Sequence, residues 1–145
     1  MKEELLELVS ENRKQIQDSI FKNEDETKQG LILSVLNGLG WNVFDTNEVT
    51  PEFGLEGKRV DYCLSIKNKP KVFIEVKKTT ENIDKRQHQK QLLEYSFSHG
   101  IELSVLTNGI DWWFYLPLKP KPWEERIFCE VDVTQDWSLP QNLYH

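Results

Sequence analysis

Hydrophobic residues recur at helical spacing in three stretches of the chain. In residues 2–21, apolar residues recur at intervals of three and four among charged residues, which predicts an amphipathic outer helix. A second apolar face runs through residues 23–41, where acidic residues occupy the first turn and Gly38 and Gly40 mark the end. Residues 79–100 carry a third apolar stripe, which ends at Gly100. The pattern therefore predicts three helices.

Shorter stretches alternate apolar and polar residues in the manner of strands. The sequence predicts strands at residues 41–45, 59–66, 71–78, 101–109, 110–117 and 125–133. Residues 67–70 predict a turn that joins the second and third of these strands into a hairpin, and Asn108-Gly109 predicts a tight turn before the fifth. The proline and glycines of residues 50–58 predict a loop, and the prolines of residues 117–123 predict an irregular connection.

The order of these elements is helix, helix, strand, hairpin, helix, hairpin, strand. This order predicts an α/β fold, in which a mixed β-sheet is flanked by helices in a single domain. A chain of 145 residues is long enough to bury such a core without disulfides. We expect an N-terminal helix over residues 1–22, the core over residues 23–116, and a C-terminal strand and tail over residues 117–145.

The charge balance narrows the classes of function. The formal net charge is -6, so the whole chain is not a strongly basic, nonspecific binder of polyanions. A local basic face is nevertheless predicted from a run of cationic residues: Lys58, Arg59, Lys67, Lys69, Lys71, Lys77, Lys78, Lys85, Arg86 and Lys90. Such a cluster can hold a nucleic-acid backbone through counterion release, although a solvated charged surface explains it equally well.

Neither the N-terminus nor the cysteines give a sign of export. The first stretch, MKEELLELVSENRKQ, lacks the apolar run of a secretory signal. Nowhere does an apolar stretch approach the roughly 20 residues that a membrane span requires. Cys63 and Cys129 lie far apart without metal-site spacing, which suits a reducing compartment. We therefore expect a cytoplasmic protein with no membrane partner.

The predicted strand FIEVKK, residues 73–78, carries charges in its middle. Because side chains alternate between the faces of a strand, Glu75 and Lys77 project from one face about 6.6 Å apart, and the predicted hairpin brings Asp61 near them. Two carboxylates held close suit Mg²⁺, and a lysine beside them can orient a water or stabilise charge on a phosphate. The alternative is that these residues form the solvated face of an edge strand.

In this arrangement the chain resembles a known group of nucleases. Asp61, an interval of thirteen residues, and Glu75-Val76-Lys77 are similar to the D…ExK core of the PD-(D/E)xK nuclease superfamily. The surroundings resemble the N-terminal nuclease domain of type I restriction enzyme motor (R) subunits and their stand-alone relatives. The stretches that carry this resemblance are ETKQGLILSVLNGLGWNVF, NEVTPEF, GKRVDYCL, KPKVFIEVKK, QLLEY and VLTNGIDWWFY, in that order.

The resemblance implies a restriction-endonuclease-like fold and a metal-dependent nuclease that hydrolyses phosphodiester bonds in DNA. It implies that Asp61 and Glu75 bind Mg²⁺, for which Mn²⁺ can substitute. The backbone carbonyl of Val76 is the candidate third ligand, and Lys77 is the residue that positions the attacking water. An acid on the preceding helix can also approach the metal in this family, and Glu26 is the candidate that we favour over its neighbour Glu24; dipole-stabilising acids explain both equally well.

Gln91 and Tyr95 match the QxxxY element that this branch carries on the helix after the catalytic strand. Residues four apart lie on one helical face, so the helix can present an amide and a phenol to the same site and orient the lysine or the phosphate. A surface glutamine and a core tyrosine are the alternative. The aromatic run at residues 112–115 could stack on bases, although strand alternation makes half of it core.

DNA is the partner that the resemblance implies, and five basic residues are the candidate contacts: Lys58, Arg59, Lys78, Arg86 and Lys90. Val60 precedes Asp61 where the superfamily name has a proline. The sequence has no Walker-type loop and no helicase motifs, so we expect a separate helicase or specificity partner. The small size of the domain also suggests a homodimer as the form that cuts two strands.

Two other classes of function stay open at this point. A catalytically inactive module of the same fold would serve nucleic-acid binding or assembly. A structural oligomerisation domain would rest on the apolar first helix and the tryptophan-rich tail. The matched positions all keep usable residue types, which favours the nuclease. Removal of Asp61 or Glu75 should then abolish cleavage, leave the fold intact, and raise its stability by relieving carboxylate repulsion in the metal-free site.

Overall fold

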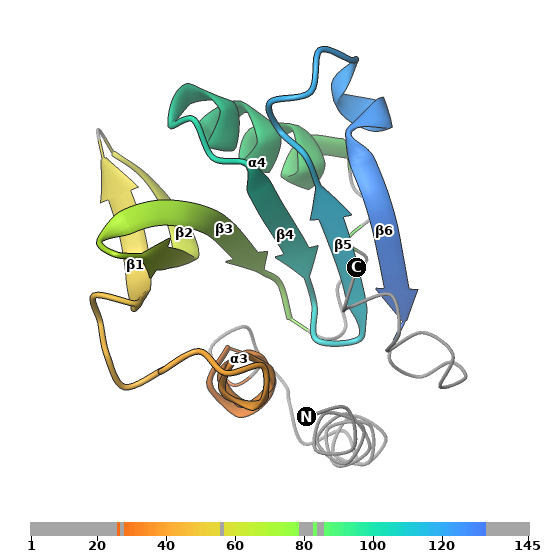
Figure 1. The fold of residues 1–145 in the computed structure, drawn as a ribbon. Coiled ribbons are helices and arrows are strands. Elements are labelled where there is room, and N and C mark those ends of the chain that lie inside the picture. Colours follow the sequence, from red (N-terminus) through yellow and green to blue (C-terminus); the bar gives the residue numbers. More distant parts are fainter. Residues whose placement is uncertain (1–25, 27, 56, 79–82, 84–85, 133–145) are drawn as a thin grey trace.

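The structure, a computed structural model, describes residues 26, 28–55, 57–78, 83 and 86–132 (Figure 1). The predicted helix over residues 2–21 lies outside the described residues, and so does the tail after residue 132. The described ranges contain the whole predicted hairpin and residues 83 and 86–100 of the helix predicted to follow it. They therefore contain nearly all of the candidate site.

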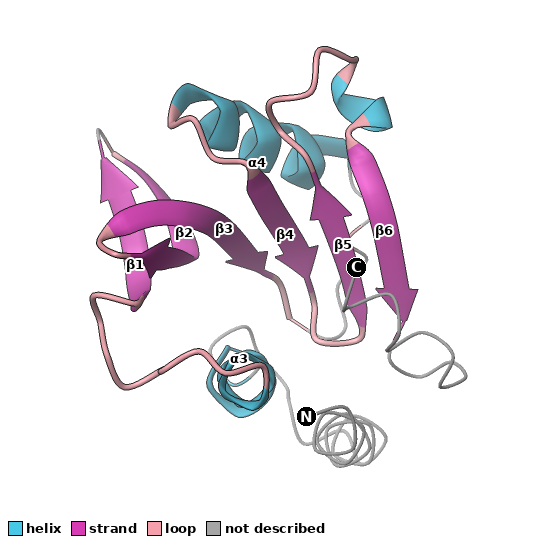
Figure 2. Ribbon diagram, viewed as in Figure 1, coloured by secondary structure: helices cyan, strands magenta, loops and turns pink. Residues whose placement is uncertain are grey.

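The described residues form one six-stranded sheet whose strands lie side by side in chain order (Figures 1 and 2). The strands are β1 (Val49–Leu55), β2 (Lys58–Ile66), β3 (Lys69–Val76), β4 (Leu103–Thr107), β5 (Asp111–Tyr115) and β6 (Ile127–Asp132). β3 and β4 run parallel, and each of the other neighbouring pairs is antiparallel. A parallel pair needs a long crossover, and α4 (Arg86–Ser98) lies in the connection that provides it. The prediction of an α/β fold with a mixed sheet is confirmed.

Helices lie on both faces of this sheet (Figure 1). α4 packs on one face, and on the other a π-helical turn, η1 (Lys28–Ile32), continues into α3 (Leu33–Gly38). A short 3₁₀ helix, η2 (Trp123–Glu125), precedes β6. Gly40 and Gly100 adopt φ of 102° and 67°, the left-handed conformation with which glycine ends a helix, as predicted. No described helix is both long and apolar enough to cross a membrane.

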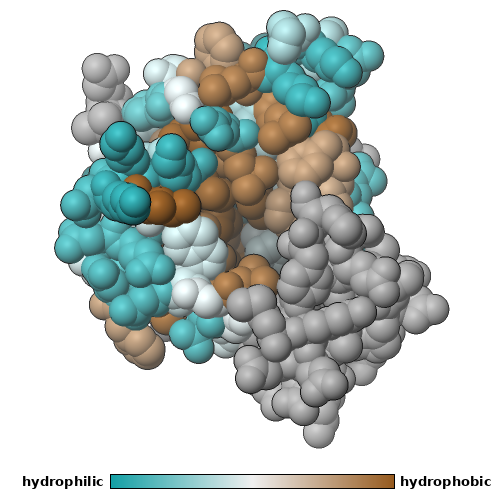
Figure 3. Space-filling view, in the orientation of Figure 1, coloured by the Kyte–Doolittle hydropathy of each residue, from teal (hydrophilic) through white to brown (hydrophobic). Residues whose placement is uncertain are grey.

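The core is divided into two apolar layers, one on each face of the sheet. Because neighbouring residues of a strand point to opposite faces, β3 contributes to both layers. Ile74 and Val76 pack in the layer that includes α3, and Phe73 packs in the layer that includes α4. Figure 3 shows apolar side chains gathered at the centre of the face that it presents. The next residue on the Phe73 side of β3 is Glu75, so this carboxylate lies at the border of the α4 layer.

Two predictions at the N-terminal side of the sheet are wrong. Residues 41–45 form turns instead of a strand, because the Asn42 and Asp45 side chains accept hydrogen bonds from backbone N–H groups two residues later and so compete with strand pairing. Residues 50–58 form most of β1 and the start of β2 instead of a loop. Pro51 is tolerated there because β1 is an edge strand, where a missing N–H costs no ladder hydrogen bond.

The β2–β3 hairpin is tighter than predicted. Only Lys67 and Asn68 form its turn, and both have positive φ, 52° and 64°, as in the type I′ turns that match the twist of paired strands. Lys69 and Pro70 were predicted to belong to the turn but lie in β3. The register that this turn sets brings the beginning of β2 alongside the end of β3.

Two carboxylates face each other across the β5–β6 pair, where Asp111 and Asp132 are direct partners. Burial raises the pKa of the Asp111 carboxyl, and the Asp132 carboxylate raises it further. A hydrogen bond with Asn108 lowers the pKa of Asp111, and the Glu130 carboxylate raises it. Ionised Asp111 is therefore less favourable in the folded protein than in the unfolded chain.

Replacing Asp111 with asparagine is expected to stabilise the protein at about pH 7. The pKa of Asp111 is higher in the folded state than in the unfolded chain. The parent therefore loses stability as the pH rises from the unfolded-state pKa through the folded-state pKa, whereas the asparagine variant has no such carboxyl and does not. Relief of a direct like-charge pair predicts a gain of about 0.2–1 kcal/mol in the free energy of unfolding. Urea unfolding at about pH 7 and about pH 3.5 measures it, with the exposed Glu102→Gln as control. A gain that persists undiminished at the acid pH would contradict the prediction.

Candidate nuclease site

The Asp61 carboxylate is fixed beside the end of β3. Asp61 is only 7% exposed, and its Oδ2 accepts a hydrogen bond of 2.6 Å from the backbone N–H of Val76. The regular ladder between β2 and β3 ends one step earlier, at the pair Tyr62 and Ile74. Beyond that pair, the Asp61 side chain accepts the hydrogen bond from the Val76 N–H, which a backbone carbonyl of β2 would accept if the ladder continued. Asp61 is thus attached to the peptide unit that joins Glu75 to Val76.

Glu75, Val76 and Lys77 present different groups around this peptide unit. Val76 is completely buried in the α3 layer, whereas Glu75 is half-buried on the α4 side. In a strand the N–H and C=O of one residue point to the same neighbour, so the Val76 carbonyl faces the β2 side, where Asp61 lies. The backbone N–H of Lys77 donates to the Thr107 carbonyl at 2.8 Å, which continues the strand by one residue. The Lys77 side chain therefore projects on the same face as Glu75.

An open cavity of about 400 Å³ lies between α4 and the ends of β2 and β3. The residues that line it are Lys58, Arg59, Val60, Glu75, Gln91, Leu92, Glu94 and Tyr95. Five of these were predicted from the sequence as site or contact residues. Glu94 was not predicted as a site residue. Its position three residues after Gln91, on the same helical face, could have indicated that it lines the site.

The Tyr95 hydroxyl has a structural partner. It donates a hydrogen bond of 3.1 Å to the backbone carbonyl of Lys58, and the tyrosine is 7% exposed. Its ring lies 5.4 Å from that of Phe73 and 4.4 Å from that of His99. Tyr95 therefore fixes the start of β2 against α4, and this contact positions Lys58 and Arg59 at the cavity.

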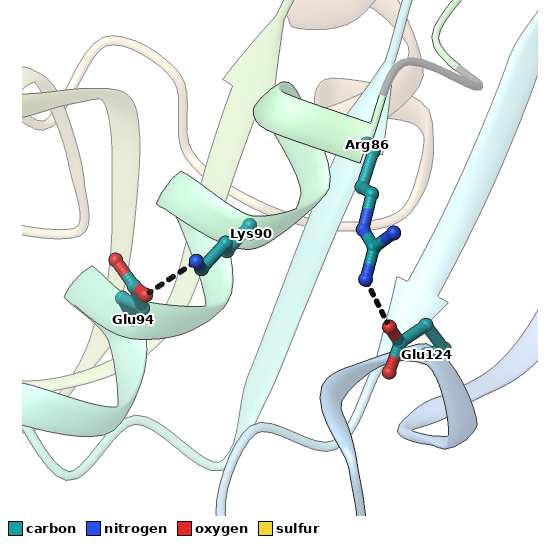
Figure 4. A network of polar contacts seen from close by, with 4 residues as sticks. All are labelled: Arg86, Lys90, Glu94 and Glu124. Atoms are coloured by element: carbon teal, nitrogen blue, oxygen red, sulfur yellow. Dashed lines mark hydrogen bonds and ion pairs between the residues drawn. The ribbon is translucent and has the colours of Figure 1, made fainter.

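The two predicted contacts on α4 have carboxylate partners (Figure 4). Arg86 makes an ion pair of 3.0 Å with Glu124 and lies over the ring of Trp123, and these residues line a separate cavity. Lys90 lies 3.9 Å from Glu94, four residues later on the same helix. Lys78 is exposed just after β3 and does not line the cavity that contains Glu75.

The groups around the Glu75–Val76 peptide include oxygen donors of the kind that a small divalent cation prefers. Two carboxylates and a backbone carbonyl are hard donors, and Mg²⁺ is usually held by one or two carboxylates together with waters and phosphate oxygens. No three histidine, cysteine, aspartate or glutamate side chains of the described residues gather into one metal-binding group. Glu26 is exposed, and its role as a further metal ligand stays a prediction, whereas Glu24 lies outside the described ranges.

The aromatic run of β5 packs against both apolar layers and does not alternate between core and surface, because Phe114 and Trp113 are half-buried against the layers that contain Trp112 and Tyr115. Trp112 and Tyr115 are buried in the two apolar layers. Trp113 is half-buried and lines the same cavity as Arg86. Trp113 is the one residue of the run 112–115 that lines this cavity.

Comparisons with known proteins identify a family and a similar fold. Residues 46–123 match the family described as type I restriction enzyme R protein N terminus, and this range includes Asp61, Glu75, Lys77 and the α4 residues of the cavity. The fold is similar to a solved fragment of a protein assigned as an HsdR subunit of a type I restriction enzyme from Vibrio vulnificus YJ016, with a TM-score of 0.57 and 19% identity. That match covers 86% of this chain and 25% of the solved chain, so this chain spans a quarter of its length. No curated protein sequence matches the chain.

Proposed function

This chain belongs to the family of type I restriction enzyme R protein N termini, and from that premise we propose that it is a Mg²⁺-dependent nuclease that hydrolyses phosphodiester bonds in DNA. Because the family is one of restriction enzymes, hydrolysis by a nuclease is the first candidate reaction and DNA is the first candidate substrate. Because the solved chain that it resembles is described as a subunit of a type I restriction enzyme, the proposal includes a helicase or specificity partner that directs cleavage.

The observation that carries the proposal is the contact between Asp61 and the peptide after Glu75. A hydrogen bond of 2.6 Å holds the Asp61 carboxylate at the end of β3, where Glu75 opens onto the cavity. In this proposal Asp61, Glu75 and the Val76 carbonyl hold Mg²⁺, or Mn²⁺ in its place. The bound cation would polarise the scissile phosphate and lower the pKa of a water.

The remaining polar residues of the site have roles on the substrate side of this proposal. Lys77 donates hydrogen bonds to the attacking water and keeps it in line with the phosphorus. The Gln91 amide, exposed at the cavity, orients the phosphate or the lysine. Lys58 and Arg59 are exposed at the same cavity and bind the neighbouring phosphates of the strand. Tyr95 acts through the Lys58 carbonyl, as a positioning residue.

Cleavage of supercoiled plasmid and of single-stranded DNA tests the proposal. We expect the parent protein to cut in Mg²⁺ and in Mn²⁺ but not in EDTA, and we expect Lys77→Ala to lower the rate by about 100-fold or more. Lys119→Ala removes the same charge from an exposed position outside the cavity and should keep the parental rate. If the parent cuts neither substrate and isothermal titration detects no binding of Mg²⁺ or Mn²⁺, the chain is a binding or assembly module of this fold.

A further inference from the structure

The basic run of the sequence is divided by the fold into separate places. Lys58 and Arg59 lie at the start of β2 beside the candidate site. Three other lysines lie at the opposite end of the β2–β3 hairpin: Lys67, Lys69 and Lys71. Six positions of strand separate Lys69 from Glu75, so this end lies about 20 Å from the site. We call residues 66–71 the hairpin tip.

The hairpin tip carries charge that the described residues do not neutralise. All residues from Ile66 to Pro70 are exposed, and Lys71 is half-buried. Within the described ranges, no ion pair or hydrogen bond engages the ammonium group of Lys67, Lys69 or Lys71. The contrast with Arg86 and Lys90, which have carboxylate partners, marks the tip as the more available anion-binding surface.

The acidic groups nearest the tip have partners of their own. Asp45 and Glu48 line a cavity together with residues 65–68 at the base of the tip. The Asp45 carboxylate accepts the backbone N–H of Asn47 at 2.9 Å, and the Glu48 carboxylate accepts that of Asn42 at 3.0 Å. Both carboxylates are therefore directed at the backbone of their own loop.

The tip also has the shape and stiffness of a groove-binding element. A two-residue turn with both residues at positive φ joins strands that are paired directly up to the turn. A two-stranded ribbon of this kind fits the width of a DNA groove. Ile66, which is 51% exposed, pairs with Lys69 across the hairpin and offers an apolar surface to the sugars.

We infer that the hairpin tip is a second DNA contact, in which Lys67, Lys69 and Lys71 bind backbone phosphates at a distance from the bond that is cleaved. The inference rests on the proposed function, because the candidate site defines where the duplex is held. A separation of about 20 Å corresponds to about six base pairs. The tip therefore binds a duplex that extends at least that far beyond the cleaved bond.

Binding of a labelled 30-base-pair duplex in EDTA, over a series of salt concentrations, tests the inference. The double variant Lys67→Gln with Lys69→Gln is compared with Lys119→Gln with Lys121→Gln, which removes the same charge from exposed positions near η2. Two lost phosphate contacts predict a decrease of about 2 in the magnitude of the slope of log Kobs against log salt, and an affinity lower by about tenfold or more. The control pair should keep the parental slope.

A second readout separates binding at the tip from chemistry at the site. In Mg²⁺ the tip variant should need about tenfold more DNA for half-maximal cleavage and keep the parental rate at saturating DNA, within about twofold. Equal slopes for the two double variants would overturn the tip contact while leaving the nuclease proposal intact. A parent that binds no duplex would overturn the tip contact, and only a parent that also cuts neither plasmid nor single-stranded DNA in Mg²⁺ would overturn the proposed function. Equal melting temperatures of the two variants confirm that both are folded.

Discussion

Glu75→Gln is expected to abolish Mg²⁺-dependent cleavage of DNA and to leave the fold intact. The substitution keeps the size of the side chain and removes its charge, so the cation would lose one of its two carboxylates. We expect the cleavage rate to fall by about 100-fold or more. Glu75 is half-buried and opens onto the cavity, so the free energy of unfolding should change by less than about 1 kcal/mol. Plasmid cleavage and urea unfolding of the same preparation measure both effects.

Glu94→Gln is the matched control for this variant. Glu94 lines the same cavity and carries the same charge, but it lies on α4 beside Lys90. Loss of an exposed pair four residues apart costs at most about 0.5 kcal/mol, and the cleavage rate should stay within about twofold of the parental rate. An equal loss of cleavage in both variants would show that the charge of the cavity matters and that Glu75 has no special role.

The central strands were predictable because their signal is local. Residues 59–66 and 71–78 alternate apolar and polar residues and match β2 and β3 closely. β1 was missed because its composition is that of a loop, and only tertiary contacts explain it. A Cβ on Gly54 would lie 2.3 Å from the backbone oxygen of Lys58, so this glycine is required by the close approach of β2.

The candidate site was predictable only in part. The hairpin register indicated that Asp61 lies near Glu75, but strand alternation gives no sign that the aspartate turns to the edge of its strand and accepts the Val76 N–H. The ion pair of Arg86 could not be predicted from a local sequence pattern either, because its partner Glu124 lies 38 residues later in the chain. A pattern of charges identifies candidate residues, whereas long-range contacts decide which of them are already engaged.

The hydrogen bond of Asp61 changes what its removal should do, compared with the expectation from the sequence that the fold stays intact and becomes more stable. Asp61→Ala would leave the N–H of the completely buried Val76 without its carboxylate acceptor. A buried donor that loses its acceptor costs about 1–3 kcal/mol, so we expect the free energy of unfolding to fall by that amount. Cleavage should be lost as well, because a proposed metal ligand is removed.

Asp61→Asn separates these two effects, because the asparagine carbonyl can still accept the Val76 N–H while the negative charge is gone. We expect this variant to keep the parental free energy of unfolding within about 1 kcal/mol and to lose cleavage by about 100-fold or more. Urea unfolding and plasmid cleavage of parent, alanine and asparagine variants measure both. If the asparagine variant cuts DNA at the parental rate, the negative charge of Asp61 is not needed for cleavage, and the side chain serves only as the hydrogen-bond acceptor for the Val76 N–H. If the alanine variant is as stable as the parent, the hydrogen bond between Asp61 and the Val76 N–H does not stabilise the fold.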